Sequence, residues 1–277
     1  KEMVDYGGKT IPFDLLVTVP TNKGDELMER SGMGDDLNYV PTHKATLQSK
    51  DYANFRPRYP ETLYDFLYSN LHSFETALDV ATGNGQVAAA LAKQFTEVYA
   101  TDISTQQLAE GPQLSNVFYK TESAEEASFP DHYFDLITVA QAIHWFDFDK
   151  FYTGVKRMLK PGGMIAVIGY GLISINKNVD PWLQHFYKNI TGPYWDKERK
   201  YIDELYTTIP FPFTEINAPP LQIEYSWTKA QFIGYVNTWS AIQHFIKAHK
   251  SHPLSDSWPD NVVHKISFPL LLRTGHL

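Results

Sequence analysis

Apolar and polar positions alternate in two rhythms between residues 51 and 171. Short apolar runs, typical of buried strands, are each followed by a stretch in which apolar residues recur at helical spacing, as Val87, Ala90 and Leu91 do. Turn-forming pairs such as Gly111-Pro112 end these helical stretches. The pattern predicts strands at Ala77–Ala81, Glu97–Ile103, Val117–Lys120, Phe134–Ala140 and Met164–Gly169, and helices at Val87–Phe95, Gln106–Glu110 and Phe148–Leu159.

Strands that alternate with helices predict an α/β fold, in which a parallel sheet is joined by right-handed crossovers. Residues 172–277 contain few strand-like runs and five of the six tryptophans, which sets them apart as a third region. The family resemblance described below implies that they form a cap or substrate region that also supplies the last sheet strands. Residues 1–50, with one apolar run at Ile11–Val19, form an N-terminal appendage. Ligands of parallel sheets bind at the carboxyl ends of the strands. This rule directs attention to residues 79–86, 102, 123–125 and 141–146.

Composition narrows the class of protein. Acidic residues exceed basic ones by 32 − 24 = 8, which disfavours a general nucleic-acid binder because such a surface repels phosphates. Cysteine is absent, which excludes disulfides, thiolate metal sites and cysteine nucleophiles. The apolar windows are shorter than the ~20 residues that span a bilayer, and no signal-peptide pattern opens the sequence. We therefore expect a cytoplasmic protein without a membrane partner.

A glycine-rich loop follows the first predicted strand. Gly83-Asn84-Gly85-Gln86-Val87-Ala88 satisfies the pattern G-x-G-x-x-G/A, which NAD, FAD and S-adenosylmethionine sites share and which a simple tight turn also satisfies. Asp79, at the end of that strand, would repel a dinucleotide pyrophosphate and attract the ammonium of S-adenosylmethionine. Asp102, at the end of the second strand, suits the ribose hydroxyls of either nucleotide. The charge of Asp79 therefore favours S-adenosylmethionine.

Several motifs in order resemble class I S-adenosylmethionine-dependent methyltransferases. Leu78-Asp79-Val80-Ala81-Thr82-Gly83-Asn84-Gly85-Gln86 resembles their first motif, with Ala81 in place of the usual glycine, a change from which we expect only a minor effect. The further matches are Thr101–Ser104, Ser123–Glu125, Ala140–Phe146 and Leu159–Gly163. The resemblance implies a Rossmann-like, seven-stranded, mostly parallel sheet whose last strand is antiparallel, with a mostly helical C-terminal cap. It implies that the cofactor is bound by Tyr52, Arg56, Asp79, Ala81, Gly83, Gly85, Asp102, Ile103, Gln107, Ser123, Ala124, Glu125 and Gln141.

Flanking segments resemble the trans-aconitate methyltransferase-like branch of that family. The segment Asp51–Pro60 and the cap sequences Gly192–Trp195, Pro210–Phe213 and Thr238–Ala241 carry this likeness, which extends over about 51–277. Members methylate small acids or related molecules, often on a carboxylate oxygen. In the segment that folds over the cofactor, the resemblance assigns Tyr52 to the sulfonium, as a cation–π contact, and an arginine, Arg56 or its rival Arg58, to the methionine carboxylate.

The acceptor side has fewer signals. His144 is a candidate general base, which a phenol or alcohol acceptor would need and an ionised carboxylate would not. Its place in a family motif favours a positioning role instead. Trp145, Tyr194 and Trp239 are candidate walls of the acceptor site, with packing in the core as the alternative for each.

Residues 1–50 do not resemble a methyltransferase. Gly8–Pro20 and Leu47–Tyr52 resemble a late segment of sulfide:quinone oxidoreductase-type flavoproteins, but the Gly-Asp flavin contact expected next is replaced by Asn54–Pro57. The abrupt change suggests a chimera, natural or engineered, without a complete flavin site. A nicotinamide- or flavin-dependent oxidoreductase and a non-catalytic S-adenosylmethionine-binding protein remain the alternatives to a methyltransferase. We expect no metal, a small carboxylic acid as the acceptor, and a monomer or homodimer.

Overall fold

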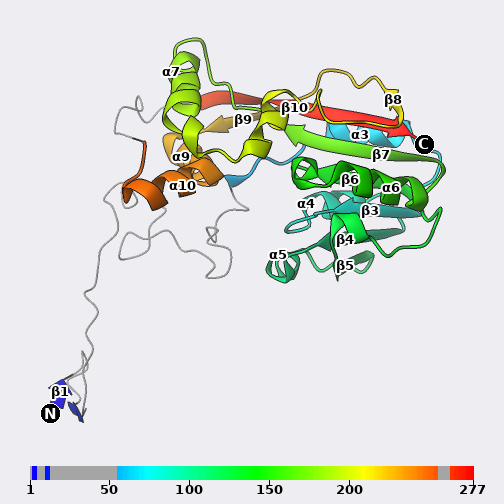
Figure 1. Cartoon of the computed structure of the whole chain (residues 1–277), viewed down its shortest axis with the longest axis horizontal. Helices are drawn as coiled ribbons and strands as arrows, with labels where there is room; N and C mark the ends of the chain where they lie inside the picture. Colours follow the sequence, from blue (N-terminus) through cyan, green and yellow to red (C-terminus); the bar gives the residue numbers. More distant parts are fainter. Residues whose placement is uncertain (1, 5–9, 13–54, 255–262) are drawn as a thin grey trace. The chain divides into compact units, whose positions relative to one another are not determined.

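A twisted sheet organises residues 55–277 of the computed structural model, which describes residues 2–4, 10–12, 55–254 and 263–277 (Figure 1). Strands β5, β4, β3, β6 and β7 are mutually parallel, whereas β10 runs antiparallel to β7 and β8. This confirms the predicted Rossmann-like, mostly parallel sheet. The strand order is β5-β4-β3-β6-β7-β10-β8, and β9 adds an eighth strand by pairing with β10. The strands are β3 (Thr76–Val80), β4 (Glu97–Asp102), β5 (Val117–Thr121), β6 (Phe134–Ala140), β7 (Leu159–Tyr170), β8 (Thr214–Ile216), β9 (Gln222–Trp227) and β10 (His264–His276).

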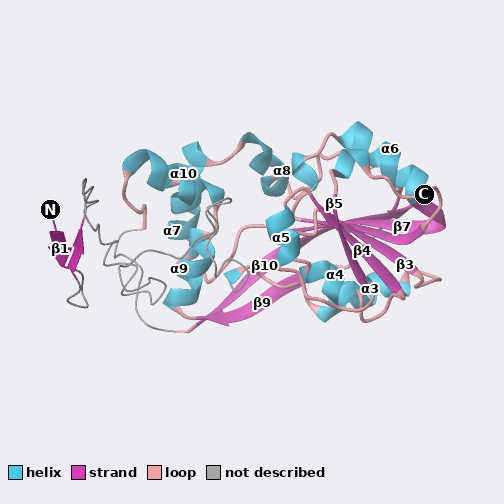
Figure 2. Ribbon diagram, turned by 90° about the horizontal axis from the view of Figure 1, so that it is seen from below, coloured by secondary structure: helices cyan, strands magenta, loops and turns pink. Residues whose placement is uncertain are grey.

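Helices cover both faces of the sheet, with α3 and α4 on one side and α6 on the other (Figure 2). Consecutive side chains of a strand point to opposite faces, so a strand covered on both sides must be apolar throughout. Leu136 and Ile137 of β6 are both fully buried and belong to the two opposite cores. The helices of this part are α3 (Glu61–Ser69), α4 (Gln86–Leu91), α5 (Thr105–Ala109) and α6 (Phe148–Met158), and the short helical turns are η1 (Ala124–Glu126) and η2 (Ile143–Trp145).

Two element boundaries differ by several residues from those expected from the sequence. Helix α4 ends at Leu91 rather than Phe95, and the residues after it form turns, with the Lys93 N–H donating to the Ala90 carbonyl at 3.3 Å and the Phe95 ring packing edge-on against Phe74. The expected turn at Lys160–Gly163 lies within β7, where Gly162 has a φ of +78° and the pairing with β6 shifts register. Thus β7 begins directly after α6.

Residues 172–277, called the cap region below, combine short helices with the strands β8, β9 and β10. The first half of β10 pairs with β9 and its second half with β7 and β8, so one strand joins this region to the sheet (Figure 2). The helices are α7 (Asp180–His185), which continues into the π-helical turn η3 (Phe186–Ile190), then η4 (Gly192–Tyr194), η5 (Lys197–Arg199), α8 (Lys200–Asp203), α9 (Lys229–Asn237) and α10 (Ser240–His249).

The chain separates into two compact units, Lys1–Lys50 and Asp51–Leu277. In the first unit the described residues form an antiparallel pair of β1 (Glu2–Val4) and β2 (Thr10–Pro12). The rest of the apolar run predicted at Ile11–Val19 lies outside the described residues. Among the residues that the structure describes, no helix has the length and apolar character needed to cross a bilayer.

Candidate functional site

The glycine-rich loop joins the carboxyl end of β3 to the start of α4. Ala81, Gly83 and Gly85 all have positive φ, at 52°, 59° and 76°. Among the described residues, a Cβ atom on Gly83 would meet only Gln107 Oε1, at 3.9 Å, whereas one on Gly85 would lie 2.5 Å from the Tyr119 hydroxyl. The loop therefore packs tightly at Gly85 and leaves Gly83 approachable. Ala81 has a left-handed backbone that glycine would adopt more easily, which explains why its position usually carries glycine.

Asp79 is a buried carboxylate without a cationic partner among the described residues. Its side chain is 1% exposed, and its oxygens accept hydrogen bonds from Thr82 Oγ1 at 2.5 Å and Thr138 Oγ1 at 2.7 Å. Burial raises the pKa of Asp79 from 3.8 to about 6, against the opposing effect of these hydrogen bonds. A buried charge of this kind stabilises a cation bound nearby. It also orders the loop through Thr82.

Asp102 and its neighbours form the carboxyl end of β4. The Asp102 carboxylate accepts hydrogen bonds from the backbone N–H groups of Gly83, at 2.9 Å, and Ser104, at 2.8 Å. Ile103 is 77% exposed, a large apolar side chain in the open beside the loop. Gln107 follows in α5, which Ser104 caps. Of these residues, Asp102 and Gln107 both lie beside Gly83.

Four further predicted cofactor residues follow the strands β5 and β6. Ser123 donates to Glu125 at 2.5 Å, and Glu125 accepts the Asp147 N–H at 3.2 Å. Burial opposes ionisation of Glu125, but these hydrogen bonds outweigh it and lower its pKa. Ala124 between them is buried in the core. Gln141, directly after β6, has a φ of +56° and donates through Nε2 to the Tyr170 carbonyl at 3.1 Å.

His144 lies in η2, on the same carboxyl edge of the sheet. It is 7% exposed, and its Nδ1 is 3.3 Å from the hydroxyl of the fully buried Tyr206. Burial, together with the charge of Arg199, lowers the pKa of His144 to about 4. The ring is therefore neutral at pH 7. Trp145 beside it is 55% exposed, with the two ring centroids 5.2 Å apart.

Arg199 is a residue of this region that the sequence analysis missed. It ends η5, which contacts η2, and its guanidinium lies 4.4 Å from the centre of the Trp195 ring. Arg199 Nε donates to the Tyr187 hydroxyl at 2.6 Å. Trp195 has an extended backbone and η5 begins only at Lys197, so no helical spacing links Trp195 to Arg199 and no local signal marked this arginine.

Arg56 joins the sheet to the cap region. Its guanidinium donates to the Tyr170 hydroxyl at 2.9 Å and to the Thr238 carbonyl at 3.1 Å. Arg58 also contacts the cap region, because its backbone N–H donates to the Tyr225 hydroxyl of β9 at 2.7 Å. The contacts place Arg56 as a tether between two parts of the fold, and its role toward a cofactor carboxylate stays a prediction. Tyr52 lies outside the described residues.

The other two candidate acceptor walls pack within the cap region. Trp239 is 3% exposed and lies among the rings of Trp195, Tyr235 and Tyr187, with centroid separations of 5.4–5.7 Å. Tyr194 packs against Phe245 of α10, with ring centroids 5.0 Å apart, and its carbonyl accepts from His244 Nδ1 at 2.9 Å. Their positions match the packing alternative, and Trp145 is the exposed member of the three. In the described part of the chain, no group of His, Asp and Glu side chains gathers as metal ligands would.

The chain is similar in sequence to known methyltransferases. Residues 78–167 match the family described as "Methyltransferase domain". A protein of Dictyostelium discoideum that is named a methyltransferase is 37% identical over 204 residues, which are 72% of this chain and 78% of that protein. The ubiquinone/menaquinone biosynthesis C-methyltransferase of Cupriavidus metallidurans is 33% identical over 120 residues, and the match spans about half of its length (49%).

A solved structure shares both sequence and fold. A protein from Anaeromyxobacter dehalogenans described as a type II methyltransferase is 33% identical, with a TM-score of 0.74. The match covers 80% of this chain and 97% of that protein. Likeness of this extent and identity supports the same family for most of the chain.

Proposed function

The chain belongs to the S-adenosylmethionine-dependent methyltransferases, and from this premise we propose that it methylates a carboxylate oxygen of a small organic acid. Membership makes the protein an enzyme and makes S-adenosylmethionine its cofactor, so the oxidoreductase and non-catalytic alternatives are set aside. The acceptor is the part that we infer from the site itself.

The carboxyl edge of the sheet fits this cofactor. Gly83 leaves room for close approach, Ile103 offers an apolar surface for the adenine, and the Asp102 carboxylate is placed for the ribose hydroxyls. Asp79 is the buried negative charge that suits an ammonium and would repel a pyrophosphate. The cofactor supplies a methyl group on a sulfonium. The residues of this chain bind it, orient it and exclude water.

The state of His144 carries the proposal of a carboxylate acceptor. A general base works best when its pKa lies near the operating pH, and burial holds that of His144 at about 4. So weak a base is poorly suited to taking the proton of a phenol or an alcohol. A carboxylic acid with a pKa of ~4 needs no base, because it is already ionised at neutral pH. His144 then positions the acceptor.

The catalytic contribution of the chain is alignment in a medium of low polarity. The acceptor oxygen, the methyl carbon and the sulfur must lie in line, and holding them there removes most of the entropic barrier. The negative charge of the acceptor and the positive charge of the donor cancel as the methyl group moves, so an apolar setting favours the step. The aromatic rings around Trp195 and Trp239 are suited to provide that setting.

The finer assignments made from the sequence complete the proposal. We place the protein in the trans-aconitate methyltransferase-like branch, on the likeness of residues 51–60 and the cap sequences. We regard residues 1–50 as the flavoprotein-like part of a chimera; flavin absorbance in the purified protein would contradict this. The cysteine-free, acidic composition supports a cytoplasmic location.

The test of the acceptor class uses the alkali sensitivity of methyl esters. The protein is incubated with S-adenosylmethionine carrying a tritiated methyl group and, separately, with trans-aconitate, fumarate, succinate or benzoate. We expect product from at least one acid to release tritiated methanol on treatment with alkali. Parallel reactions contain phenol and hydroquinone. Alkali-stable label from these acceptors, with none from the acids, would contradict the proposal and favour methylation of a carbon or a phenol oxygen. The name of the Cupriavidus relative describes that protein as a C-methyltransferase.

A further inference from the structure

Arg199 is a mostly buried cation held on two sides by the cap region. Its side chain is 19% exposed, and its guanidinium lies over the ring of Trp195, 4.4 Å from the centroid, and that of Tyr187, 5.3 Å away. Nε donates to the Tyr187 hydroxyl at 2.6 Å. The nearest carboxylate, Asp203, is 3.7 Å from Nε and half exposed. The stacking and the Nε contact fix the plane of the guanidinium.

The outer edge of this guanidinium remains available. An arginine carries five N–H donors, four of them on the two terminal nitrogens. Among the described residues, neither terminal nitrogen of Arg199 forms a hydrogen bond, and the one hydrogen bond of its side chain uses Nε. A planar pair of N–H groups held by aromatic stacking matches the geometry of a carboxylate.

Two further donors lie in the same neighbourhood. The indole N–H of Trp195, which stacks with Arg199, is buried without a hydrogen-bond partner within the described part of the chain. The second is His144. The Tyr206 hydroxyl has only His144 Nδ1 as a partner among the described residues, and by donating to it the hydroxyl avoids leaving a buried donor unpaired. The neutral imidazole then carries its proton on Nε2 and acts as a donor.

We propose that Arg199 is the specificity-determining residue that binds the carboxylate of the methyl acceptor, with Trp195 and His144 as neighbouring donors. The inference rests on the proposed function, since it assigns the recognition of the acid that is methylated. The paired contact uses one lone pair on each carboxylate oxygen and orients the group, and a remaining lone pair on one oxygen faces the methyl carbon. A neutral analogue of the same shape loses the charge-assisted contact with Arg199.

The experiment separates anion recognition from catalysis. Protein loaded with S-adenosylhomocysteine is titrated by calorimetry with benzoate and succinate and with their neutral analogues benzamide and succinamide. The variants are Arg199→Gln, the charge-preserving Arg199→Lys, and Lys197→Gln as the matched control. Lys197 lies in the same turn, and its side chain is 91% exposed, so the control removes the same charge without touching the proposed contact.

We expect the unmodified protein and Lys197→Gln to prefer at least one acid to its amide by about 10- to 100-fold. Arg199→Gln should lose the preference, and Arg199→Lys should keep part of it. All variants should bind S-adenosylhomocysteine equally, which shows that they are folded. A preference that survives in Arg199→Gln, or no preference in the unmodified protein, would overturn the proposal. If the acids bind through Arg199 but never yield an alkali-labile methyl group, the anion site stands and the proposed function fails.

Discussion

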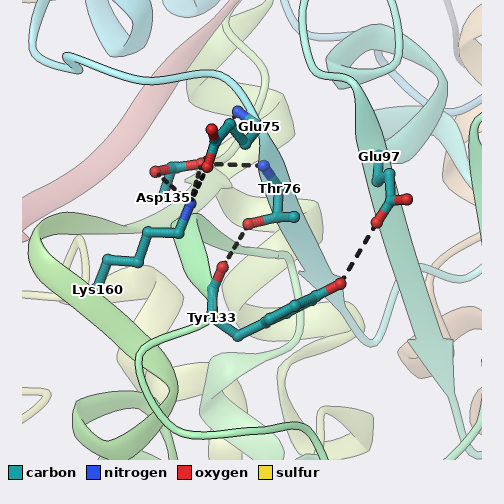
Figure 3. A network of polar contacts seen from close by, with 6 residues as sticks. All are labelled: Glu75, Thr76, Glu97, Tyr133, Asp135 and Lys160. Carbon is teal, nitrogen blue, oxygen red and sulfur yellow. Dashed lines mark hydrogen bonds and ion pairs between the residues drawn. The ribbon is translucent and has the colours of Figure 1, made fainter.

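The two edges of the central sheet each contain a buried carboxylate, and the two carboxylates differ in whether a cation is paired with them. At the amino ends of the strands, Asp135 is 5% exposed and is paired with Lys160 at 3.0 Å (Figure 3). It also accepts the N–H groups of Glu75 and Thr76 at 2.9–3.0 Å. At the carboxyl ends, Asp79 is 1% exposed and has hydroxyl donors but no cationic partner in the described part of the chain.

This difference separates a structural edge from a functional one. A buried carboxylate is costly unless a cation and hydrogen bonds compensate it, and Asp135 has both. The Asp79 charge has hydroxyl donors but no cation among the described residues, and a bound cation would offset the remaining cost. The Lys160–Asp135 pair joins β7 to β6 and explains the lysine of the Leu159–Gly163 motif without any ligand. The two carboxylates thus differ in purpose although each lies on a buried central strand.

The largest effect is expected from closing the loop at the functional edge. Gly85→Ala places a Cβ 2.5 Å from the Tyr119 hydroxyl in a backbone with a φ of +76°. Strain and overpacking together should lower the free energy of unfolding by about 2–4 kcal/mol, measured by urea denaturation. Gly162→Ala is the matched control, because Gly162 has a similar φ of +78° and no atom within 4 Å of the added Cβ. Gly162→Ala should lower the free energy of unfolding by about 1 kcal/mol, and equal losses in the two variants would contradict the packing argument.

Removing the cation at the structural edge should be next in size. Lys160→Met leaves the Asp135 charge without its partner and should cost about 1–3 kcal/mol, less than for a fully buried pair because Lys160 is 26% exposed. Glu75→Gln removes the other carboxylate that pairs with Lys160. The Glu75 side chain is 74% exposed, so this variant should lower the free energy of unfolding by less than about 0.5 kcal/mol. Methyl transfer per folded molecule should be unchanged in both. A lower affinity for S-adenosylhomocysteine in Lys160→Met would contradict a purely structural role for this edge.

Neutralising the uncompensated carboxylate should stabilise the cofactor-free protein. The pKa of Asp79 is about 6 in the folded state and 3.8 ordinarily, so the folded state binds the proton more tightly and stability falls as pH rises from about 4 to about 6. Asp79→Asn removes the pH-dependent loss of stability. Its hydrogen bonds to Thr82 and Thr138 are weaker, so the free energy of unfolding should rise by only about 1–2 kcal/mol at pH 7. The gain should vanish below pH 4. Denaturation at both pH values measures it, and a variant that is less stable at pH 7 would contradict the account.

The smallest effect concerns backbone strain in the loop. Ala81→Gly relieves a left-handed residue with a φ of +52° and should raise the free energy of unfolding by about 0.5–1 kcal/mol. Lys250→Gly, at a φ of +58° after α10, is a control outside the loop and should gain a similar amount. Affinity for S-adenosylhomocysteine should change in neither. A marked change in Ala81→Gly alone would show that Ala81 has a role in binding beyond its backbone.

Much of the functional edge was predictable because its residues follow one another in short motifs. The expected strands place Asp79 and Asp102 at adjacent carboxyl ends, and in the structure the Gly83 N–H of the loop after Asp79 donates to the Asp102 carboxylate at 2.9 Å. Buried strands and tight turns are encoded locally, so the Rossmann-like sheet could be predicted as well. The boundaries of α4 and β7 could not, because the packing of Phe95 and the bulge before Leu136 depend on distant neighbours.

The acceptor side was not predictable for a physical reason. Arg199 acquires its setting from Trp195, Tyr187 and the turn that holds His144, and these approach one another only through the tertiary fold. Similarly, nothing in the local sequence shows that Trp239 is enclosed by other rings while Trp145 is exposed. Arg56 bonds to Tyr170 and Thr238, which follow it in the sequence by 114 and 182 positions.

The central claim is that the uncompensated charge of Asp79 serves the amino-acid end of the cofactor. Calorimetric titration at pH 7 compares S-adenosylhomocysteine, which carries an ammonium, with 5′-methylthioadenosine, which lacks the whole amino-acid part. In Asp79→Asn we expect affinity for S-adenosylhomocysteine to fall by about tenfold or more and affinity for methylthioadenosine to stay unchanged, while Glu75→Gln at the opposite edge alters neither. Equal losses for both ligands, or no loss for either, would contradict the claim.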